Sequence, residues 1–263
     1  MPNLTDLMKD AELVVAAAAA KLQLMQSRPL RTERKDLRDI VTEADLAAEE
    51  IVVTGLKKLT PDAAILAEER GASMGSNGAR WIIDPLDGTI NYARGLPWFS
   101  VTVAYEENGT VVLGLLDAPA MKLEARYLKD RIATVDGKPA FVSNTDSVGD
   151  AVISVILTSH FSREEVRRTA AIIERLGSVA RGVRIVISGG LEMALVASGR
   201  LDAFVSIKAD AVSHAAAMQL VRAAGGKVTR VDGKDSGVDD IEKIASNGHI
   251  HDELLSQLRE ALR

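Results

Sequence analysis

The stretch around which the chain is organised reads Trp81-Ile82-Ile83-Asp84-Pro85-Leu86-Asp87-Gly88-Thr89-Ile90-Asn91-Tyr92. Its apolar start predicts the end of a buried strand, and Pro85 with Asp87-Gly88 predicts a sharp turn at that point. Two carboxylates three residues apart at a strand end are well placed to hold a hard divalent cation such as Mg²⁺, which prefers oxygen ligands. The alternative is an ordinary surface turn, because Pro and Asp-Gly favour turns in any protein.

Composition limits the classes of protein to which the chain can belong. Of its 263 residues, 47% are hydrophobic and 26% are charged, which is typical of a globular protein with one large domain or two lobes. The net charge of −5 and the aromatic content of 3% favour neither nucleic acid nor an anionic membrane as a partner. The absence of cysteine excludes thiolate chemistry and is compatible with the cytoplasm, where we expect the protein to act.

Further carboxylates fall at the ends of other predicted elements. Thr42 followed three residues later by Asp45 predicts the start of a helix. Residues 63–66 predict a strand, and that strand ends at the acidic pair Glu68-Glu69. Asp45 could simply be a favourable first-turn carboxylate, and the acidic pair could be exposed loop charges. With the two aspartates of the central stretch, however, several oxygen ligands could converge at one edge of a sheet.

The order of the predicted elements divides the chain into two lobes. A long helix over residues 3–25 starts the first lobe, and the strands after residue 99 predict an antiparallel meander. In the second lobe strands alternate with helices: strands 151–157, 183–187 and 201–207, and helices 162–176, 191–197 and 213–224. We predict one domain, 1–263, with an α+β lobe over 1–148 that contains the candidate metal ligands and a smaller α/β lobe over 149–263.

These motifs resemble those of the inositol monophosphatase family of Mg²⁺-dependent, lithium-sensitive phosphatases. The stretch 81–92 matches the family signature, and residues 39–45 and the pair Glu68-Glu69 occur in the expected order before it. The likeness extends from the first helix to residues 245–247. It implies an α+β/α/β fold, the layered αβαβα sandwich of the sugar-phosphatase type, usually assembled as a homodimer.

The resemblance also implies a role for each residue of the site. Four groups would bind metal ions: Glu68, Asp84, the carbonyl of Leu86, and Asp87. Glu68 would also serve catalysis, and Asp45 and Thr89 would orient and deprotonate a metal-activated water. The backbone amides of Gly88 and Thr89 would bind the phosphate, and Lys35 would lie near the first metal. Phosphoryl transfer asks mainly for such positioning and charge neutralisation.

The second half of the chain departs from the family pattern. Counted back from residues 224–226, Ser213 stands where the family has a carboxylate ligand of a second metal, and Ser206 where some members have a substrate-binding glutamate. A neutral hydroxyl binds Mg²⁺ more weakly than a carboxylate does. Asp210 could reach in instead, or Ser213 could be an ordinary helix N-cap. The segment 184–190 carries isoleucines where the family has a serine and a glycine.

The predicted function follows from both halves. The substrate-side residues are Ser188, Gly189, Ser206 and Asp210, whereas His214 is expected to be structural. We predict a Mg²⁺-dependent phosphomonoesterase that hydrolyses a small polyol or sugar phosphate such as inositol monophosphate, with neither nucleic acid nor a membrane as partner. Histidinol phosphate, a sugar bisphosphate and a nucleoside phosphate remain alternative substrates. The alternative function is that of a degenerate family member with an impaired second metal site, which acts mainly by binding a ligand or a protein partner.

Overall fold

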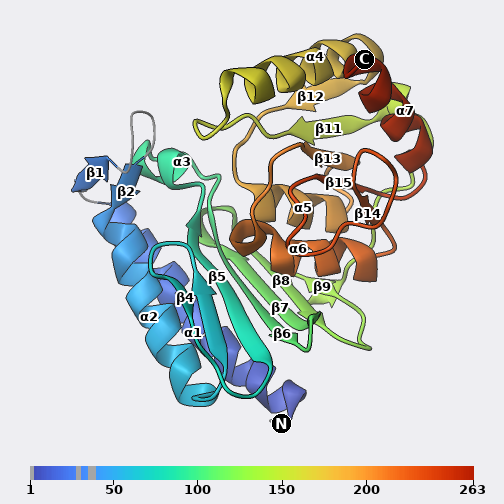
Figure 1. The fold of residues 1–263 in the computed structure, drawn as a ribbon. Coiled ribbons are helices and arrows are strands. Elements are labelled where there is room, and N and C mark those ends of the chain that lie inside the picture. The colour runs from blue at the N-terminus through green and yellow to red at the C-terminus, as the bar shows by residue number, and fades with distance from the viewer. Residues whose placement is uncertain (1–2, 28–30, 35–39) are drawn as a thin grey trace.

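The structure, a computed structural model, describes residues 3–27, 31–34 and 40–263 (Figure 1). Helices and sheets alternate in five layers, with two helices in each helical layer. From one side to the other, the helices are α1 (Leu4–Gln26) and α2 (Glu43–Leu59), then α5 (Gly189–Ala197) and α6 (Ala211–Ala223), then α4 (Arg163–Val179) and α7 (His251–Ala261). The predicted αβαβα sandwich is therefore confirmed.

The larger sheet has eight strands in the order β10-β9-β8-β7-β6-β5-β3-β4. The strands are β3 (Ala64–Ala67), β4 (Gly71–Ser73), β5 (Ala79–Asp87), β6 (Ser100–Glu107), β7 (Thr110–Ala118), β8 (Leu123–Leu128), β9 (Thr134–Val135) and β10 (Lys138–Pro139). All neighbours are antiparallel except β3 and β5. This confirms the antiparallel meander. A separate antiparallel pair, β1 (Thr32–Arg34) and β2 (Ile40–Thr42), precedes α2.

The smaller sheet has five strands in the order β12-β11-β13-β15-β14. They are β11 (Val152–Val155), β12 (Gly182–Arg184), β13 (Ala203–Ser206), β14 (Lys227–Thr229) and β15 (Lys243–Ser246). The first three run parallel, as expected for strands that alternate with helices, whereas β14 and β15 add an antiparallel edge. The sequence pattern predicted neither these last two strands nor α7.

The middle helices are buried on all sides because they lie between the two sheets (Figure 1). Apart from Glu192, α5 contains small and apolar residues, as a fully enclosed helix requires. Helix α6 approaches β7 very closely at Gly114, where a Cβ atom would lie 3.2 Å from the Cα atom of Ala216. Because α5 and α6 pack against strands of both sheets, they connect the two halves of the chain. The division at residue 148 stays a prediction.

Several predicted boundaries are wrong. The strand expected over residues 183–187 ends at Arg184. Strand β5 does not stop at Asp84 but continues through Pro85 to Asp87. Helix α4 continues past Gly177 to Val179, since a glycine inside a helix weakens it without ending it. Helix α6 begins at Ala211, with Asp210 rather than Ser213 as its N-cap. The predicted helix starts at Thr42 and Ser162 are confirmed by complete capping boxes. Across the described ranges, no helix is long and apolar enough to cross a membrane.

Candidate active site

A cavity of about 320 Å³ opens where the end of β5 faces the segments that precede α5 and α6. Most of the predicted site residues line it: Glu68, Asp84, Leu86, Asp87, Gly88, Thr89, Gly189, Asp210 and Ser213. Asp45 and Ser188 lie directly behind this lining, where they hydrogen-bond to Thr89 and Asp87 respectively. Ser206 is buried and is not part of the lining. Lys35 lies outside the described residues.

A β-bulge brings the two aspartates of β5 to the same cavity. Asp84 pairs with Thr102 on β6, and Asp87 pairs with Ser100, so β5 has one more residue than β6 over this interval. In a regular strand, residues three apart point to opposite faces of the sheet. The extra residue shifts this alternation by one, so Asp84 and Asp87 point to the same face of the sheet. Pro85, which has no backbone N–H to donate to a neighbouring strand, lies within the bulge. The sharp feature predicted here is therefore a bulge in the strand, and it gathers the carboxylates.

Asp84 is a buried carboxylate surrounded by other acids. Its side chain is 2% exposed, and it accepts hydrogen bonds from the backbone N–H of Leu86 at 3.0 Å and from Ser213 Oγ at 2.7 Å. Burial raises its pKa well above the usual range, and the neighbouring charges of Glu68, Asp87 and Asp210 raise it further. A divalent cation at this place would reverse that repulsion. The donor set is therefore suited to a metal ion.

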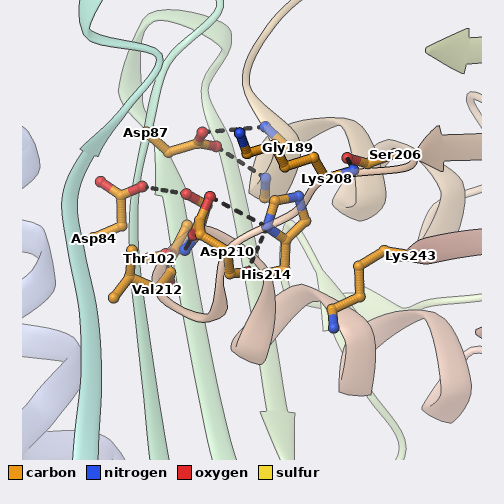
Figure 2. A network of polar contacts seen from close by, with 12 residues as sticks. Asp84, Asp87, Thr102, Gly189, Ser206, Lys208, Asp210, Val212, His214 and Lys243 are labelled. Atoms are coloured by element: carbon orange, nitrogen blue, oxygen red, sulfur yellow. Dashed lines mark hydrogen bonds and ion pairs between the residues drawn. The ribbon is translucent and has the colours of Figure 1, made fainter. Parts of the chain in front are cut away.

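Asp87 is held by the N-terminus of α5. It accepts hydrogen bonds from Ser188 Oγ at 2.8 Å and from the backbone N–H of Gly190 at 2.9 Å. The backbone N–H of Gly189 donates to it at 3.1 Å (Figure 2). Ser100 Oγ adds a fourth bond at 3.2 Å. Burial raises the pKa of Asp87, whereas the hydrogen bond from Ser188 acts in the opposite direction. The carboxylate thus satisfies the unpaired amides of the helix start and ties β5 to α5.

These contacts affect the two metal positions differently. As the side chains stand, no three His, Cys, Asp or Glu residues of the described ranges are close enough together to hold a metal ion. Glu68, Asp84 and the carbonyl of Leu86 all border the cavity and form a set of hard oxygen donors for one cation. A second cation has less support. Asp87 is engaged by α5, and Ser213 donates to Asp84, so it occupies an oxygen that a second ion would need.

Asp45 and Thr89 form the pair that the resemblance implies. Thr89 Oγ1 donates a hydrogen bond to Asp45 Oδ1 at 2.8 Å and lies 3.1 Å from the carbonyl oxygen of Leu86. The other oxygen of Asp45 accepts from both the backbone N–H and the hydroxyl of Thr42. Asp45 is fully buried, and burial raises its pKa. It is therefore both the third-position acid of the α2 capping box, whose N-cap is Thr42, and the fixed acceptor that orients the Thr89 hydroxyl.

Gly88 is needed for the backbone turn that leads into α3 (Thr89–Ala93). Its φ of +94° lies in the left-handed region, and a Cβ atom at this position would lie 2.6 Å from the carbonyl oxygen of Trp98. The first N–H groups of a helix have no partner within it. Gly88 and Thr89 lie at this helix start, and both line the cavity.

The start of α6 shows that Ser213 is not the N-cap of this helix. Asp210 Oδ1 accepts from the backbone N–H of Ser213 at 2.7 Å, so Asp210 caps the helix and Ser213 lies in its first turn. His214 Nδ1 lies 3.0 Å from the carbonyl oxygen of Asp210 (Figure 2). Its ring fits because residue 189 is glycine, where a Cβ atom would lie 2.3 Å from Nε2. His214 therefore supports the wall of the cavity, consistent with a structural role.

Sequence reasoning missed two polar residues of the site. Asn91 is within the central stretch, and its side-chain amide donates to the carbonyls of Trp98, Val186 and Ile187 at 2.7 to 3.1 Å. Glu192 on α5 is fully buried and accepts from the backbone N–H of Ser188 at 3.0 Å. The Asn91 contacts join residues far apart in the chain, so no local pattern reveals them. A glutamate inside an otherwise apolar helix was the available signal for Glu192.

Glu192 predicts a pH dependence of stability. Burial raises its pKa to about 7 from the ordinary 4.5, although hydrogen bonds from Ser154 and Ser188 act in the opposite direction. Between pH 4.5 and about 7 the folded state holds a proton that the unfolded state releases. The free energy of unfolding should therefore fall as pH rises through this range, by on the order of 3 kcal/mol from this group.

Urea unfolding of the wild type and Glu192→Gln at pH 5 and pH 8 tests this dependence. The glutamine can accept from Ser188 and donate to the Ser154 hydroxyl, so it imitates the protonated acid. We expect similar stability at pH 5 and a more stable variant at pH 8. An equal difference at both pH values would show that Glu192 does not titrate in this range.

Comparison with known proteins shows the family of the chain. The model of the inositol monophosphatase family matches residues 3–263. A Thermotoga maritima protein described as fructose-1,6-bisphosphatase/inositol-1-monophosphatase is 38% identical over 231 residues, which cover 88% of this chain and 86% of that protein. A Nus factor SuhB from Pasteurella multocida is 30% identical over 237 residues, covering 89% and 87%. The solved structure of an inositol monophosphatase from Anabaena aligns with a TM-score of 0.88 at 30% identity, covering 98% and 97%.

The fold and the matched relatives define the class of protein, which is that of phosphoric monoester hydrolases that depend on a metal ion. The chain belongs to the inositol monophosphatase family. This confirms the resemblance seen in the central stretch 81–92 and its upstream motifs.

Proposed function

We propose that this protein is a Mg²⁺-dependent phosphomonoesterase that acts on a small sugar or polyol phosphate. One observation carries the proposal: the Thr89 hydroxyl, fixed on the buried Asp45, faces a cavity that also contains Asp84 and its neighbouring acids. Phosphoryl transfer to water needs an oriented nucleophile beside a centre of positive charge. This arrangement supports both requirements within one cavity.

The residues of the chain have separate tasks in this proposal. The Thr89 hydroxyl donates to Asp45, so its lone pairs are free to accept a hydrogen bond from the attacking water and align it. As Thr89 takes the proton of the water, its own proton can pass to Asp45. The amides of Gly88 and Thr89 hold phosphate oxygens, and Asp87 keeps α5 against β5 so that the substrate side stays in place. Glu68, Asp84 and the carbonyl of Leu86 would hold the ion. When bound, Mg²⁺ supplies Lewis acidity and lowers the pKa of water.

A phosphate-release assay over a panel of monophosphates at saturating Mg²⁺ tests this function. The panel should contain inositol 1-phosphate, histidinol phosphate, a sugar bisphosphate and a nucleoside monophosphate. We expect release from at least one member, and loss of that release on chelation. Absence of release across the panel would contradict the proposal.

Ser213 predicts an unusual metal response. It donates to Asp84 instead of supplying charge, so a second cation should bind weakly in the wild type. Ser213→Asp should shift Mg²⁺ binding to lower concentration by about tenfold or more, a change of the size seen when groups around a metal site are altered. Without metal the new carboxylate repels Asp84, so the variant should unfold at a lower temperature than the wild type. Addition of Mg²⁺ should raise the unfolding temperature of the variant again.

Calorimetric titration with Mg²⁺ measures this shift, and Asp210→Asn serves as the control. Asparagine is also a good N-cap, so this control keeps α6 intact. If Asp210→Asn is silent, the carboxylate at 210 is not a substitute ligand. If Ser213→Asp also leaves Mg²⁺ binding unchanged, Ser213 does not border a metal position.

A second candidate function is binding without turnover. The hydrogen bond from Ser213 to Asp84 favours it, because it replaces a charged ligand by a neutral one. A relative described as a Nus factor, SuhB, suggests a protein partner. Saturable binding of the panel members without phosphate release would support this alternative. We further infer that the chain acts in the cytoplasm as a homodimer, as the family resemblance implies, and sedimentation of the purified protein tests the assembly.

A further inference from the structure

Ile187 has a backbone conformation that its side chain disfavours. Its φ is +64°, and of the five non-glycine residues with positive φ in the described ranges, it is the β-branched one. In the left-handed region a branched Cβ crowds the neighbouring carbonyl oxygens, so glycine or asparagine would be adopted there at lower cost. Such strain persists when the surroundings impose it, and it is concentrated at functional sites.

The surroundings do impose this conformation, because both peptide units that flank Ile187 are held. On one side the Asn91 amide donates to the carbonyl of Val186 at 2.7 Å. On the other side it donates to the carbonyl of Ile187 at 3.1 Å, and the N–H of the same peptide unit, on Ser188, donates to Glu192 at 3.0 Å. These hydrogen bonds fix the left-handed backbone conformation at residue 187, whatever side chain this residue carries.

The side chain at 187 lines the candidate active-site cavity. Ser188, the next residue, donates its hydroxyl to Asp87, so Ile187 lies one residue from the acidic centre. Other large apolar residues line the same cavity from separate segments, and we call four of the lining residues the apolar wall: Ile90, Ile156, Phe161 and Ile187. The alcohol part of a substrate bound at the acidic centre would share the cavity with this wall.

A polyol is a poor match for such a wall. Each hydroxyl placed against it would lose a hydrogen bond to water without a replacement, and that loss is unfavourable. A second phosphate is poorly matched too, because the ammonium group of Lys208 in the lining is already held by Glu165 at 3.0 Å and by the carbonyl of His160 at 3.1 Å. An aromatic ring, by contrast, gains from burial against isoleucine and phenylalanine.

We propose that Ile187 is a specificity-determining residue, and that its apolar side chain selects phosphate monoesters whose alcohol carries an aromatic ring over phosphates of bare polyols. This inference rests on the proposed function, since it names the substrate class of the same site. The ring could be a nucleobase or a simple aryl group. Both offer the same flat apolar face to the wall.

The test compares three substrates with the Ile187→Gly variant. The substrates are adenosine 3′-monophosphate, 2-phenylethyl phosphate and inositol 1-phosphate, all esters of alkyl alcohols, so that the reactivity of the leaving group differs little. In the wild type we expect kcat/KM to be higher for at least one ring-bearing ester than for the inositol ester. Ile187→Gly should lower that ratio about tenfold or more, the effect of removing several methylenes from a pocket.

Ile185→Gly is the matched control. Ile185 belongs to the same segment but is 44% exposed and does not line the cavity, so its loss should leave the substrate ratio unchanged. Thermal unfolding gives a second readout. Ile187→Gly should unfold at no lower temperature than the wild type because strain is removed, whereas Ile185→Gly should unfold earlier.

The outcomes separate this inference from the proposed function. Phosphate release with preference for inositol 1-phosphate, or an unchanged ratio in Ile187→Gly, would overturn the inference and leave the phosphatase in place. If none of the esters is hydrolysed, the proposed function fails, and calorimetric binding of the same three esters still decides the inference. Tighter binding of a ring-bearing ester that is lost in Ile187→Gly supports it, and equal binding overturns it. Preference among the two ring-bearing esters distinguishes a nucleobase from an aryl group.

Discussion

Asp84→Asn is expected to abolish phosphate release while leaving the fold intact. Asp84 is the buried centre of the acidic cluster, and its pKa is raised by burial and by Glu68, Asp87 and Asp210. Removing its charge takes away a central ligand of the proposed metal site, so Mg²⁺ should no longer be held. Asparagine can still accept from Leu86 and donate to Ser213, so local hydrogen bonding survives.

Circular dichroism, thermal unfolding and calorimetric Mg²⁺ titration accompany the activity measurement. Asp239→Asn is the matched control, because that carboxylate is 74% exposed and lies away from the cavity lining. We expect the control to retain activity and Mg²⁺ binding. Near-normal turnover in Asp84→Asn would show that the metal assignment is wrong.

Thr89→Ala is expected to lower the turnover rate by a factor of about 10² to 10⁴, the usual contribution of general acid–base catalysis by one side chain. The hydroxyl is held at 2.8 Å from Asp45 and 3.1 Å from the carbonyl of Leu86, so it is oriented before substrate binds. Without it Asp45 loses its link to the attacking water. Mg²⁺ affinity should change little, because the proposed ligands Glu68 and Asp84 remain.

Thr89→Ser separates the chemical role of the hydroxyl from a structural one. Serine keeps the donor to Asp45 and should retain most of the activity, with stability close to that of Thr89→Ala. Steady-state kinetics over a range of Mg²⁺ concentrations measures both effects. A raised Mg²⁺ requirement at an unchanged maximal rate in Thr89→Ala would make Thr89 a structural residue.

Local signals were sufficient for the framework of the site. The spacing of Thr42 and Asp45 predicts the capping box of α2, and the meander follows from turn residues between short apolar runs. The bulge was not predictable, since it depends on how β5 pairs with β6: Pro85 with Asp87-Gly88 reads equally well as a turn. The same bulge decides that Asp84 and Asp87 share one cavity.

Contacts between distant segments account for what the sequence did not show. Asp87 is bound by the amides of α5, about a hundred residues later, and only the packing of the middle layer brings them together. The left-handed backbone at Ile187 is equally hidden, because isoleucine is a residue that local preference would place in a strand. It results from the hydrogen bonds that Asn91 and Glu192 form with the flanking peptide units.

The central claim, that the carboxylates at the end of β5 form a metal-dependent phosphatase site, is tested most directly by removal and return of Mg²⁺. Protein treated with a chelator and then dialysed would be assayed for phosphate release from its best panel substrate as Mg²⁺ is added. We predict no release before addition and a saturable recovery with Mg²⁺. Full turnover in the metal-free protein would contradict the claim.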